Sequence, residues 1–531
     1  MKKVIAVSSL KKVFPDSVNI AEISEFSMLK NEVKSFQLVF DAVKGERVEL
    51  SVNSPLSDYL KFSYVKMING GYSVPDKADD YYIDKRDAYP DLLLPIDNCF
   101  TAEYDGLNTV WVQISGDNLP SGEFDVCVGS ECSVKVHIID ALLPKQELIY
   151  TNWLHTDCLM SHYGFEAFSD EYWRVTESFL RRATEYGMNC VLTPLFTPPL
   201  DTKIGGERPT VQLVDVKVIG ENQYEFGFEK LDRWLEMCDR CNVEYYEMSH
   251  FFTQWGARHA PKIVADVNGA EKRIFGWDTS ATGGEYKLFL KQFAKAFSEY
   301  IDKKGIRERC FLHVSDEPSA GMLRAYRGAS KIVHNNFKNF KVIDAMSSYF
   351  LYKFGKTQTP IPANNHINSF IGRVPELWTY YCSSQNNHYV SNRLFAMPSE
   401  RNRVIGLQLY KFDVKGFLHW GYNFYYTQYS KRQVDPFTEA DAGGKFPSGD
   451  SYVVYPGEKG EPLDSLRLYV FYDALQDLRA LKLLESKIGR QKTLAIVEQG
   501  LDKPLTFSEY PHNAKWLEDV RERINKAISE N

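Results

Sequence analysis

The stretch Phe311-Leu312-His313-Val314-Ser315-Asp316-Glu317-Pro318 begins as an apolar run and ends on two adjacent carboxylates and a proline. Such a run predicts a buried strand, and the proline marks its end. In a parallel α/β barrel the carboxyl ends of the strands form the catalytic face, so Asp316 and Glu317 are candidate catalytic residues. The alternative is a plain strand-to-helix junction, in which Ser315 or Asp316 only caps the following helix.

Strands and helices alternate on both sides of this stretch, from about residue 148 onward. Eight strands are expected, at residues 148–156, 188–196, 243–252, 309–316, 341–348, 363–370, 376–382 and 416–423. Helices are expected at 170–186, 229–241, 284–304, 320–337 and 392–410, with a long amphipathic helix at 465–488. No clear helix lies between Ile367 and Trp378. Eight such units predict a (β/α)₈ barrel, with insertions at 211–228, 253–283 and 433–462.

Residues 1–142 follow a different pattern, with apolar and polar residues alternating in short runs such as Ser35-Phe36-Gln37-Leu38-Val39-Phe40. This alternation, with frequent turn residues, predicts an all-β sandwich. We therefore expect a β-sandwich domain at 1–142 and a (β/α)₈ barrel with C-terminal helices at 143–531. No sandwich residue shows an obvious chemical role, so packing on the barrel, one wall of a cleft, or a contribution to a homo-oligomer is expected of it.

The composition limits the class of protein. The chain has 531 residues, a formal net charge of −7 and no long Lys/Arg stripe, which argues against a nucleic-acid partner. Nine cysteines without a framework pattern predict a fold that is not built on disulfides. No stretch approaches the ~20 apolar residues of a membrane span, and the apolar run at 4–10 is short for a signal peptide. We expect a soluble protein, cytoplasmic as written or exported if a leader has been removed.

Polar and aromatic residues recur at the ends of the predicted strands. Eight of them are candidates for substrate binding: Asn152, His155, His250, Trp378, Tyr380, Tyr381, Trp420 and Asn423. Aromatic faces stack on the C–H surface of sugar rings, while Asn and His bind hydroxyl or amide groups, so this set suits a sugar. Each aromatic residue, taken singly, has core packing as its alternative.

Other reaction classes lack their usual motifs. Paired histidines are missing from the strand ends, since His155-Thr156-Asp157 is the nearest approach, so no metal is expected. No glycine-rich phosphate loop, nucleophile elbow or Cys/His signature follows a strand either. We therefore expect neither a metal nor an organic cofactor.

Glycoside hydrolysis fits the acidic pair. An ordinary retaining glycosidase needs a second carboxylate from another strand, but the nearest candidate, Glu376, begins its predicted strand and lies at the wrong end of the barrel. In substrate-assisted hydrolysis the carbonyl oxygen of a 2-acetamido group replaces that nucleophile. One carboxylate then holds the acetamido N–H and a neighbouring carboxylic acid protonates the leaving oxygen, two tasks that an adjacent Asp-Glu pair suits.

Several motifs resemble glycoside hydrolase family 123. They are Val314-Ser315-Asp316-Glu317-Pro318, Gly416-Phe417-Leu418-His419-Trp420-Gly421-Tyr422-Asn423, Gly449-Asp450-Ser451-Tyr452-Val453-Val454-Tyr455-Pro456-Gly457, and the helix from Leu466-Arg467-Leu468-Tyr469 to Leu478-Arg479. The resemblance implies an N-terminal β-sandwich, a (β/α)₈ barrel and β-N-acetylgalactosaminidase activity without a metal or organic cofactor. The last-strand motif departs from the family in being rich in tyrosine, with Tyr425, Tyr426 and Tyr429.

The same resemblance implies roles for single residues. Asp316 would orient and polarise the acetamido group, and Glu317 would act as general acid and then as general base. Tyr380 or Tyr381 would stabilise the oxazolinium-like intermediate. Because two close carboxyls push their titrations apart, we expect Glu317 to hold the proton of the pair while Asp316 stays charged.

The sequence therefore predicts a retaining, exo-acting hydrolase that removes a terminal β-linked N-acetylgalactosamine by substrate assistance. Its partner would be a glycan or glycoconjugate with a terminal 2-acetamido sugar. Two alternatives stay open: a related glycosidase acting on another sugar, and a catalytically silent carbohydrate-binding protein.

Overall fold

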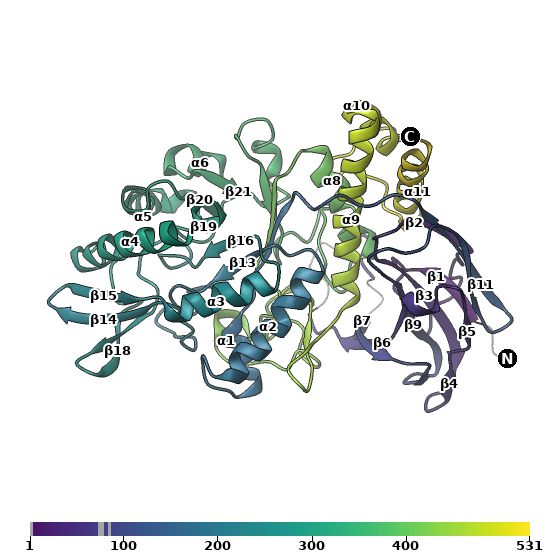
Figure 1. Cartoon of the computed structure of the whole chain (residues 1–531), viewed down its shortest axis with the longest axis horizontal. Helices are drawn as coiled ribbons and strands as arrows, with labels where there is room; N and C mark the ends of the chain where they lie inside the picture. The colour runs from purple at the N-terminus through teal and green to yellow at the C-terminus, as the bar shows by residue number, and fades with distance from the viewer. Residues whose placement is uncertain (1–3, 73–78, 83–86) are drawn as a thin grey trace.

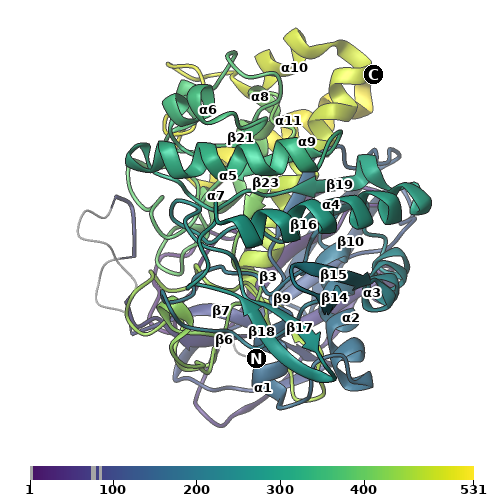
Figure 2. The ribbon, with the colours of Figure 1, turned by 90° about the vertical axis from the view of Figure 1, so that its left-hand side faces the viewer.

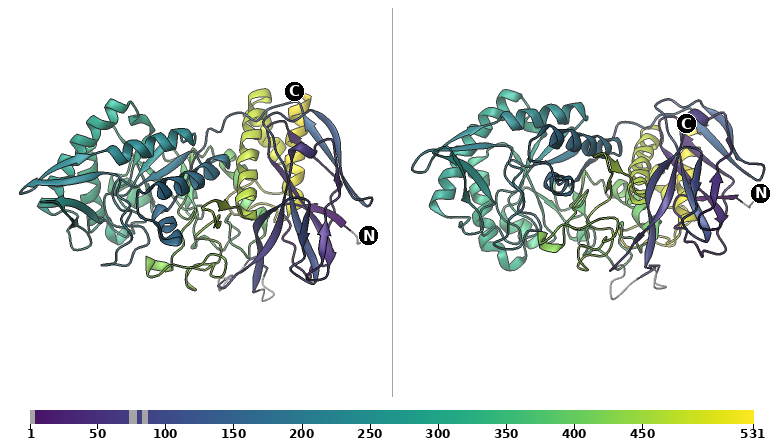
Figure 3. Two further views of the ribbon diagram at one scale, coloured as in Figure 1. Left: turned by 60° about the horizontal axis from the view of Figure 1, so that its bottom comes forward. Right: turned by 90° about the horizontal axis from the view of Figure 1, so that it is seen from below.

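The computed structural model describes residues 4–72, 79–82 and 87–531. The chain forms three parts: an α/β barrel, a β-sandwich, and C-terminal helices that lie between them (Figure 1). Figure 3 shows the same order from two further directions, with the C-terminal helices between barrel and sandwich. In the described part of the chain, none of the helices combines the length and the apolar character that crossing a membrane requires.

The sandwich contains two main sheets. One has the order β1 (Val4–Ser8), β3 (Lys34–Ala42), β9 (Gly106–Ile114), β6 (Leu60–Asn69) and β7 (Ala88–Ile96). The other has the order β2 (Glu25–Leu29), β11 (Cys132–Ile139), β10 (Gly122–Val128) and β5 (Val52–Asn53). A short pair, β4 (Arg47–Glu49) with β8 (Cys99–Thr101), lies beside them. The alternating apolar residues of β3, β9 and β11 form one buried cluster, which confirms the predicted sandwich.

Eight parallel strands form the barrel. In chain order they are β12 (Ile149–Asn152), β13 (Cys190–Thr193), β16 (Tyr245–Met248), β19 (Cys310–Leu312), β20 (Lys341–Ala345), β21 (Thr359–Ile361), β22 (Trp378–Tyr380) and β23 (Gly416–His419). Consecutive strands pair from β12 to β21, β22 pairs with β23, and β23 pairs with β12. A parallel bridge between Ala363 and Tyr380 closes the ring just beyond β21. The predicted (β/α)₈ barrel is confirmed.

The sixth strand was misplaced by the sequence analysis. It lies at Thr359–Ile361, before the predicted range 363–370, where Ile367–Ser369 instead form a single 3₁₀ turn. The strand has only three residues and a proline at its centre, Pro360, and such a pattern argues against a strand on sequence rules. The other seven strands lie within their predicted ranges, although they are shorter.

Helices cover the outside of the barrel: α2 (Asp170–Glu185), α3 (Glu229–Arg240), α4 (Gly284–Lys304), α5 (Leu323–Asn336) and α9 (Leu466–Ile488). Figure 2, which views the end far from the sandwich, shows α4 and α5 side by side. Their ends follow local signals, since the Ser465 hydroxyl accepts the Leu468 N–H at the start of α9 and Gly305 (φ 68°) ends α4.

The predicted helix 392–410 is wrong in extent. Two short helices, α7 (Ser399–Arg403) and α8 (Ile405–Lys411), replace it. Pro398 precedes α7, and a proline is tolerated only at the beginning of a helix, so residues 392–397 cannot continue through it.

One insertion builds an additional sheet. The hairpin β14 (Asp215–Gly220) and β15 (Gln223–Gly227) joins β17 (Ile263–Val267) and β18 (Ala270–Phe275) in the order β15-β14-β17-β18. This sheet projects from the barrel at the end away from the sandwich (Figure 1).

Buried ion pairs tie the sandwich to the C-terminal helices. The Arg467 guanidinium of α9 donates to both oxygens of Asp91 on β7, at 2.7 and 2.9 Å. Arg521 of α11 (Ala514–Glu530) binds Glu32, which follows β2, and Asp477 of α9. Removing one partner of such a pair leaves an uncompensated buried charge, so the pairs fix how the two parts sit against each other.

Candidate active site

A pocket of about 230 Å³ opens at the carboxyl ends of the barrel strands. Residues that follow, or lie at the ends of, seven of the eight strands line it. Among them are Trp153 after β12, Asp201 after β13, Trp255 after β16, the Asp316–Glu317 pair after β19, Tyr380 at the end of β22 and Trp420 after β23. The volume is below the usual range for ligand sites, so the pocket suits a single small ring rather than an extended chain.

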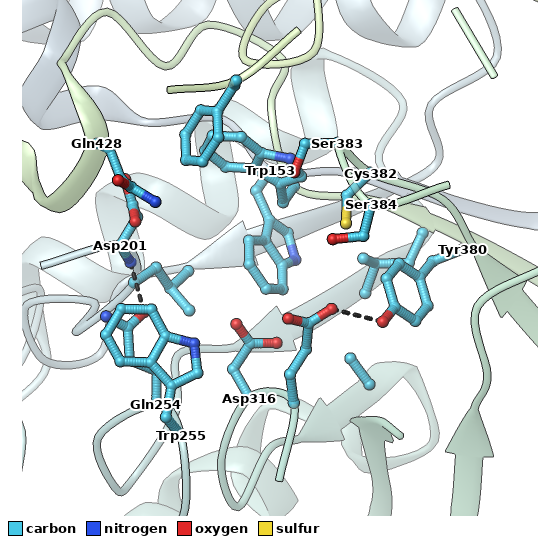
Figure 4. A pocket seen from close by; sticks show the side chains of 16 residues that line it. Trp153, Asp201, Gln254, Trp255, Asp316, Tyr380, Cys382, Ser383, Ser384 and Gln428 are labelled. Atoms are coloured by element: carbon cyan, nitrogen blue, oxygen red, sulfur yellow. Dashed lines mark hydrogen bonds between the residues drawn. The ribbon is translucent and has the colours of Figure 1, made fainter. Parts of the chain in front are cut away.

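Asp316 points into this pocket (Figure 4), and Glu317, the next residue of the same bend, also lines it. Asp316 is partly buried and Glu317 is exposed. The bend is unusual because Glu317 has a left-handed backbone, with a φ of 42°. That conformation costs a non-glycine residue about 1 kcal/mol or more, and Pro318 further disfavours a helical alternative. Because successive side chains leave such a bend in different directions, both carboxylates can approach one ligand.

Some of the residues with left-handed backbone lie at the pocket. Besides Glu317, it occurs at Asp201 (φ 40°), Trp255 (φ 57°) and Tyr429 (φ 66°), of which the first two line the pocket. Such conformations persist where the surroundings enforce them, and they gather at functional sites. At these positions the surrounding contacts hold the backbone in a conformation that it would not otherwise favour.

A buried aspartate holds the backbone that leads to the acidic pair. One oxygen of Asp344, on β20, accepts the N–H groups of Val314 and Ser315 at 2.9 and 3.3 Å. Its other oxygen accepts the hydroxyl of Tyr326. Asp344 does not line the pocket, so it is a positioning residue for the loop that carries Asp316.

A histidine lies between two carboxylates inside the barrel. The His313 Nε2 is 2.5 Å from Glu247 Oε1, and its Nδ1 is 3.3 Å from Asp344 Oδ1. Burial opposes the charged imidazolium, but Glu247 and Asp344 outweigh it and raise the pKa of His313 to about 9. The same Glu247 accepts the indole N–H of Trp153 at 2.7 Å, which fixes that ring in the pocket.

We predict that Asp344→Asn destabilises the fold by about 3 kcal/mol near neutral pH, because it leaves the buried His313 imidazolium with one anion fewer. The pKa of His313 is raised in the fold, so the stabilisation is full below pH 6.5 and is lost as the pH rises through about 9. Urea unfolding at about pH 6 and about pH 10 measures the effect.

The exposed Asp278→Asn is the control and should barely change the unfolding midpoint at either pH. A penalty for Asp344→Asn that is the same at both pH values would show that the ion pair with His313 contributes nothing to it.

A tyrosine contacts the acidic pair directly. The Tyr380 hydroxyl donates to Glu317 Oε1 at 2.5 Å (Figure 4). Burial raises the pKa of Asp316 well above its usual range, and the neighbouring Glu317 carboxylate raises it further. Burial and the neighbouring carboxylate therefore both favour the protonated form of Asp316 in the free site.

Aromatic residues cover much of the remaining wall. Trp153, Trp255, Trp420 and Phe446 line the pocket, and the Trp420 and Phe446 rings meet edge-on, with centroids 5.4 Å apart. The Trp420 indole N–H donates to Asp450 at 3.0 Å, and burial raises the pKa of Asp450 to about 7. Flat apolar faces beside carboxylates are what a sugar ring requires of its binding site.

Four of the ten predicted site residues meet in the pocket: Asp316, Glu317, Tyr380 and Trp420. Three others do not line it: Tyr381 and Asn152 are next to the pocket residues Tyr380 and Trp153 and so face the opposite side, whereas Trp378 faces the same side as Tyr380 but lies deeper in the barrel. Tyr381 packs against His419 and contacts Asn402. Asn152 donates to the Tyr150 hydroxyl. Trp378 lies deep in the barrel, where its indole N–H bonds Glu376.

The other three predicted residues support the pocket from behind. Asn423 binds the backbone N–H and C=O of His155 at 2.8 and 3.1 Å, which joins the loops after β12 and β23. The His155 ring bonds the Trp420 carbonyl, and burial, with the Arg208 charge, lowers the pKa of His155 to about 4. His250 stacks on His313, with centroids 4.2 Å apart.

Several pocket residues were not predicted. Asp201, Gln254, Trp255 and Gln428 come from long loops after β13, β16 and β23, whose course depends on tertiary contacts. For these residues, the sequence signal was a tryptophan-bearing insertion at 253–283, which contains Trp255. In the described part of the chain, no cluster of three or more His, Cys, Asp or Glu side chains could hold a metal ion.

Comparison with known proteins agrees with this site. A family model described as glycoside hydrolase 123, catalytic domain, matches residues 153–484. No curated protein sequence matches the chain. A family 123 glycoside hydrolase from Clostridium perfringens, studied for glycolipid glycan hydrolysis, has a similar structure, with a TM-score of 0.73, 14% identity and coverage of 100% of this chain and 98% of that one.

Weaker structural likenesses are to other glycoside hydrolases. A family 2 member from Bacteroides cellulosilyticus has a TM-score of 0.29 and 11% identity, over 79% of this chain and 46% of that one. A family 5 mannosidase from Rhizomucor miehei has a TM-score of 0.32 and 11% identity, over 66% and 95%. With its match over most of the barrel and the acidic pair at the end of β19, the chain belongs to glycoside hydrolase family 123.

Proposed function

We propose that this glycoside hydrolase removes terminal β-linked N-acetylgalactosamine from glycans by substrate-assisted catalysis. The observation that carries the proposal is the adjacent pair Asp316 and Glu317 at the base of a pocket for one ring, with the Tyr380 hydroxyl bonded to Glu317. The similar Clostridium perfringens enzyme was studied for glycolipid glycan hydrolysis, which makes glycolipid glycans the first natural substrates to consider.

In the first step, the carbonyl oxygen of the substrate's acetamido group attacks C1 while the bond from C1 to the leaving oxygen breaks. Glu317, as the carboxylic acid, gives its proton to that oxygen. Asp316 accepts the acetamido N–H and, as a carboxylate, balances the positive charge that develops on the oxazolinium ring. Binding of that N–H to Asp316 favours the charged form of Asp316.

In the second step, Glu317 is the carboxylate and takes a proton from water, and the water oxygen attacks C1. The bond between C1 and the acetamido oxygen breaks, which regenerates the acetamido group. Two inversions at C1 give a product of retained β configuration. The Tyr380 hydroxyl keeps Glu317 in place through both steps.

A glycosidase for another sugar is the second candidate, and Asp201 is the observation that favours it. This third carboxylate of the pocket could act as a nucleophile on a sugar without an acetamido group. However, it lies beside Gln254 and Gln428, on the wall opposite Tyr380 (Figure 4), whose hydroxyl binds Glu317.

The two candidates differ in their need for the 2-acetamido group. We expect the protein to hydrolyse 4-nitrophenyl β-N-acetylgalactosaminide and to be inhibited by the thiazoline analogue of the oxazoline intermediate. The matching β-galactoside, which has a hydroxyl at position 2, should not react. Turnover of the galactoside without thiazoline inhibition would favour the second candidate, and binding without any turnover would favour a silent carbohydrate-binding protein.

A further inference from the structure

Asp201 belongs to a braced wall of the pocket. Its backbone N–H donates to Gln254 Oε1 at 2.5 Å, and the Gln254 amide in turn donates to the Thr202 carbonyl at 3.2 Å. The Tyr429 N–H donates to Asp201 Oδ2 at 2.9 Å. Three loops, which follow β13, β16 and β23, therefore hold this single carboxylate in place.

One oxygen of Asp201 is available to a ligand. Oδ2 is taken by Tyr429, whereas Oδ1 has no hydrogen-bond partner among the residues that the structure describes, and the side chain lines the pocket. Burial raises the pKa of Asp201 to about 6, so the side chain is still charged at pH 7.5 and can accept a hydrogen bond there. Its left-handed backbone, with a φ of 40°, is a strain that the surrounding bonds maintain.

The wall that carries Asp201 lies where C4 of the sugar is expected. If C1 lies at Glu317 and the acetamido group at Asp316, the ring must extend away from the wall that carries Tyr380. In a six-membered ring C4 lies directly across from C1. Asp201 and Gln428 occupy the wall across the pocket from Tyr380 (Figure 4), and the Tyr380 hydroxyl binds Glu317.

We propose that Asp201 determines the specificity at position 4 of the sugar by accepting a hydrogen bond from the 4-hydroxyl group. The proposal rests on the proposed function, because the acetamido group at Asp316 and C1 at Glu317 set the direction of the ring. A fixed, charged acceptor can discriminate between the axial and the equatorial 4-hydroxyl, since only one of them points its O–H at Oδ1.

Asp201→Asn tests this with little change in shape. The single amide oxygen is expected to keep the bond from the Tyr429 N–H, which turns the NH₂ group toward the pocket and replaces the acceptor with a donor. At about pH 7.5, kcat/KM for 4-nitrophenyl β-N-acetylgalactosaminide should fall about 10- to 100-fold, the effect of one hydrogen bond to a charged group. The ratio of kcat/KM for the N-acetylgalactosaminide to kcat/KM for its N-acetylglucosaminide epimer should move toward one.

A 4-deoxy substrate separates recognition from a general structural role. The wild type should hydrolyse the 4-deoxy N-acetylgalactosaminide about 10- to 100-fold less efficiently than the 4-hydroxy substrate. On the 4-deoxy substrate, kcat/KM of Asp201→Asn should be close to that of the wild type. Asp201→Ser provides a second variant for the same cycle if the asparagine variant does not fold. Asp266→Asn, on the distant additional sheet, is the matched control and should leave both values unchanged.

The outcomes are distinct. Equal losses on the 4-hydroxy and 4-deoxy substrates would overturn the assignment of Asp201 while leaving the proposed function intact. If the wild type hydrolyses neither N-acetylhexosaminide but does cleave other sugars, the proposed function itself fails, and the assignment fails with it. Loss confined to the 4-hydroxy substrate would establish Asp201 as the position-4 determinant.

Discussion

Glu317→Gln should lower kcat/KM by about 100- to 10,000-fold on a β-N-acetylgalactosaminide whose leaving group is an ordinary sugar alcohol, the range for loss of a general acid. The glutamine keeps the shape of Glu317 and can still accept the Tyr380 hydroxyl, but it has no proton to give to the leaving oxygen. The pH profile of kcat/KM should also lose its fall at high pH, because that fall reports the proton of the coupled pair.

The leaving group provides the internal control for this variant. The 2,4-dinitrophenolate group leaves its glycoside without needing a proton. On this substrate, Glu317→Gln should therefore impair formation of the oxazoline much less. Glu308→Gln, on the surface at the opposite end of β19, should behave as the wild type. Equal losses on both leaving groups, with the basic limb of the pH profile unchanged, would remove Glu317 from the role of general acid.

Asp316→Asn should lower kcat by about 100- to 1,000-fold, comparable to removing one preorganised group that stabilises a developing charge. The asparagine can still accept the acetamido N–H but carries no negative charge to balance the oxazolinium ring. KM should change much less than kcat, because that charge develops only in the transition state.

Thiazoline inhibition checks the same assignment without turnover. Its affinity should fall in Asp316→Asn roughly in proportion to kcat, because the inhibitor resembles the charged intermediate. Asp302→Asn, an exposed substitution, serves as the control. If Asp316→Asn lowers kcat but binds the thiazoline as tightly as the wild type, Asp316 does not act on the intermediate.

The sequence carries enough information for the barrel and the acidic pair but not for the rest of the pocket. The strand before Asp316 is an apolar run with a clear end, so its place in the barrel and the position of the acidic pair beyond its carboxyl end follow from the sequence. The sequence does not show which side chains at the ends of the other strands face the pocket. Tyr380 and Tyr381 are equivalent in the sequence, yet only Tyr380 faces the pocket.

The wall that carries Asp201 is even harder to predict from the sequence, because it is built from contacts between distant loops. Asp201 is held by Gln254 and Tyr429, which are 53 and 228 residues away in the chain. Neither spacing produces a periodic pattern in the sequence. The left-handed backbone at Asp201 is also not marked by a glycine. The raised pKa of Asp316 likewise depends on burial, which the sequence does not show.

The ion pair between Asp91 and Arg467 determines how this protein can be divided or recombined. The Arg467 guanidinium also binds the carbonyls of Gly449 and Tyr452, at 2.6 and 2.7 Å, on the segment whose Asp450 holds the Trp420 indole. An anion from the sandwich thus stabilises the arginine that anchors an aromatic wall of the pocket. A barrel fused to a sandwich without an acid at this position would therefore contain an unpaired buried cation beside the aromatic wall of its pocket.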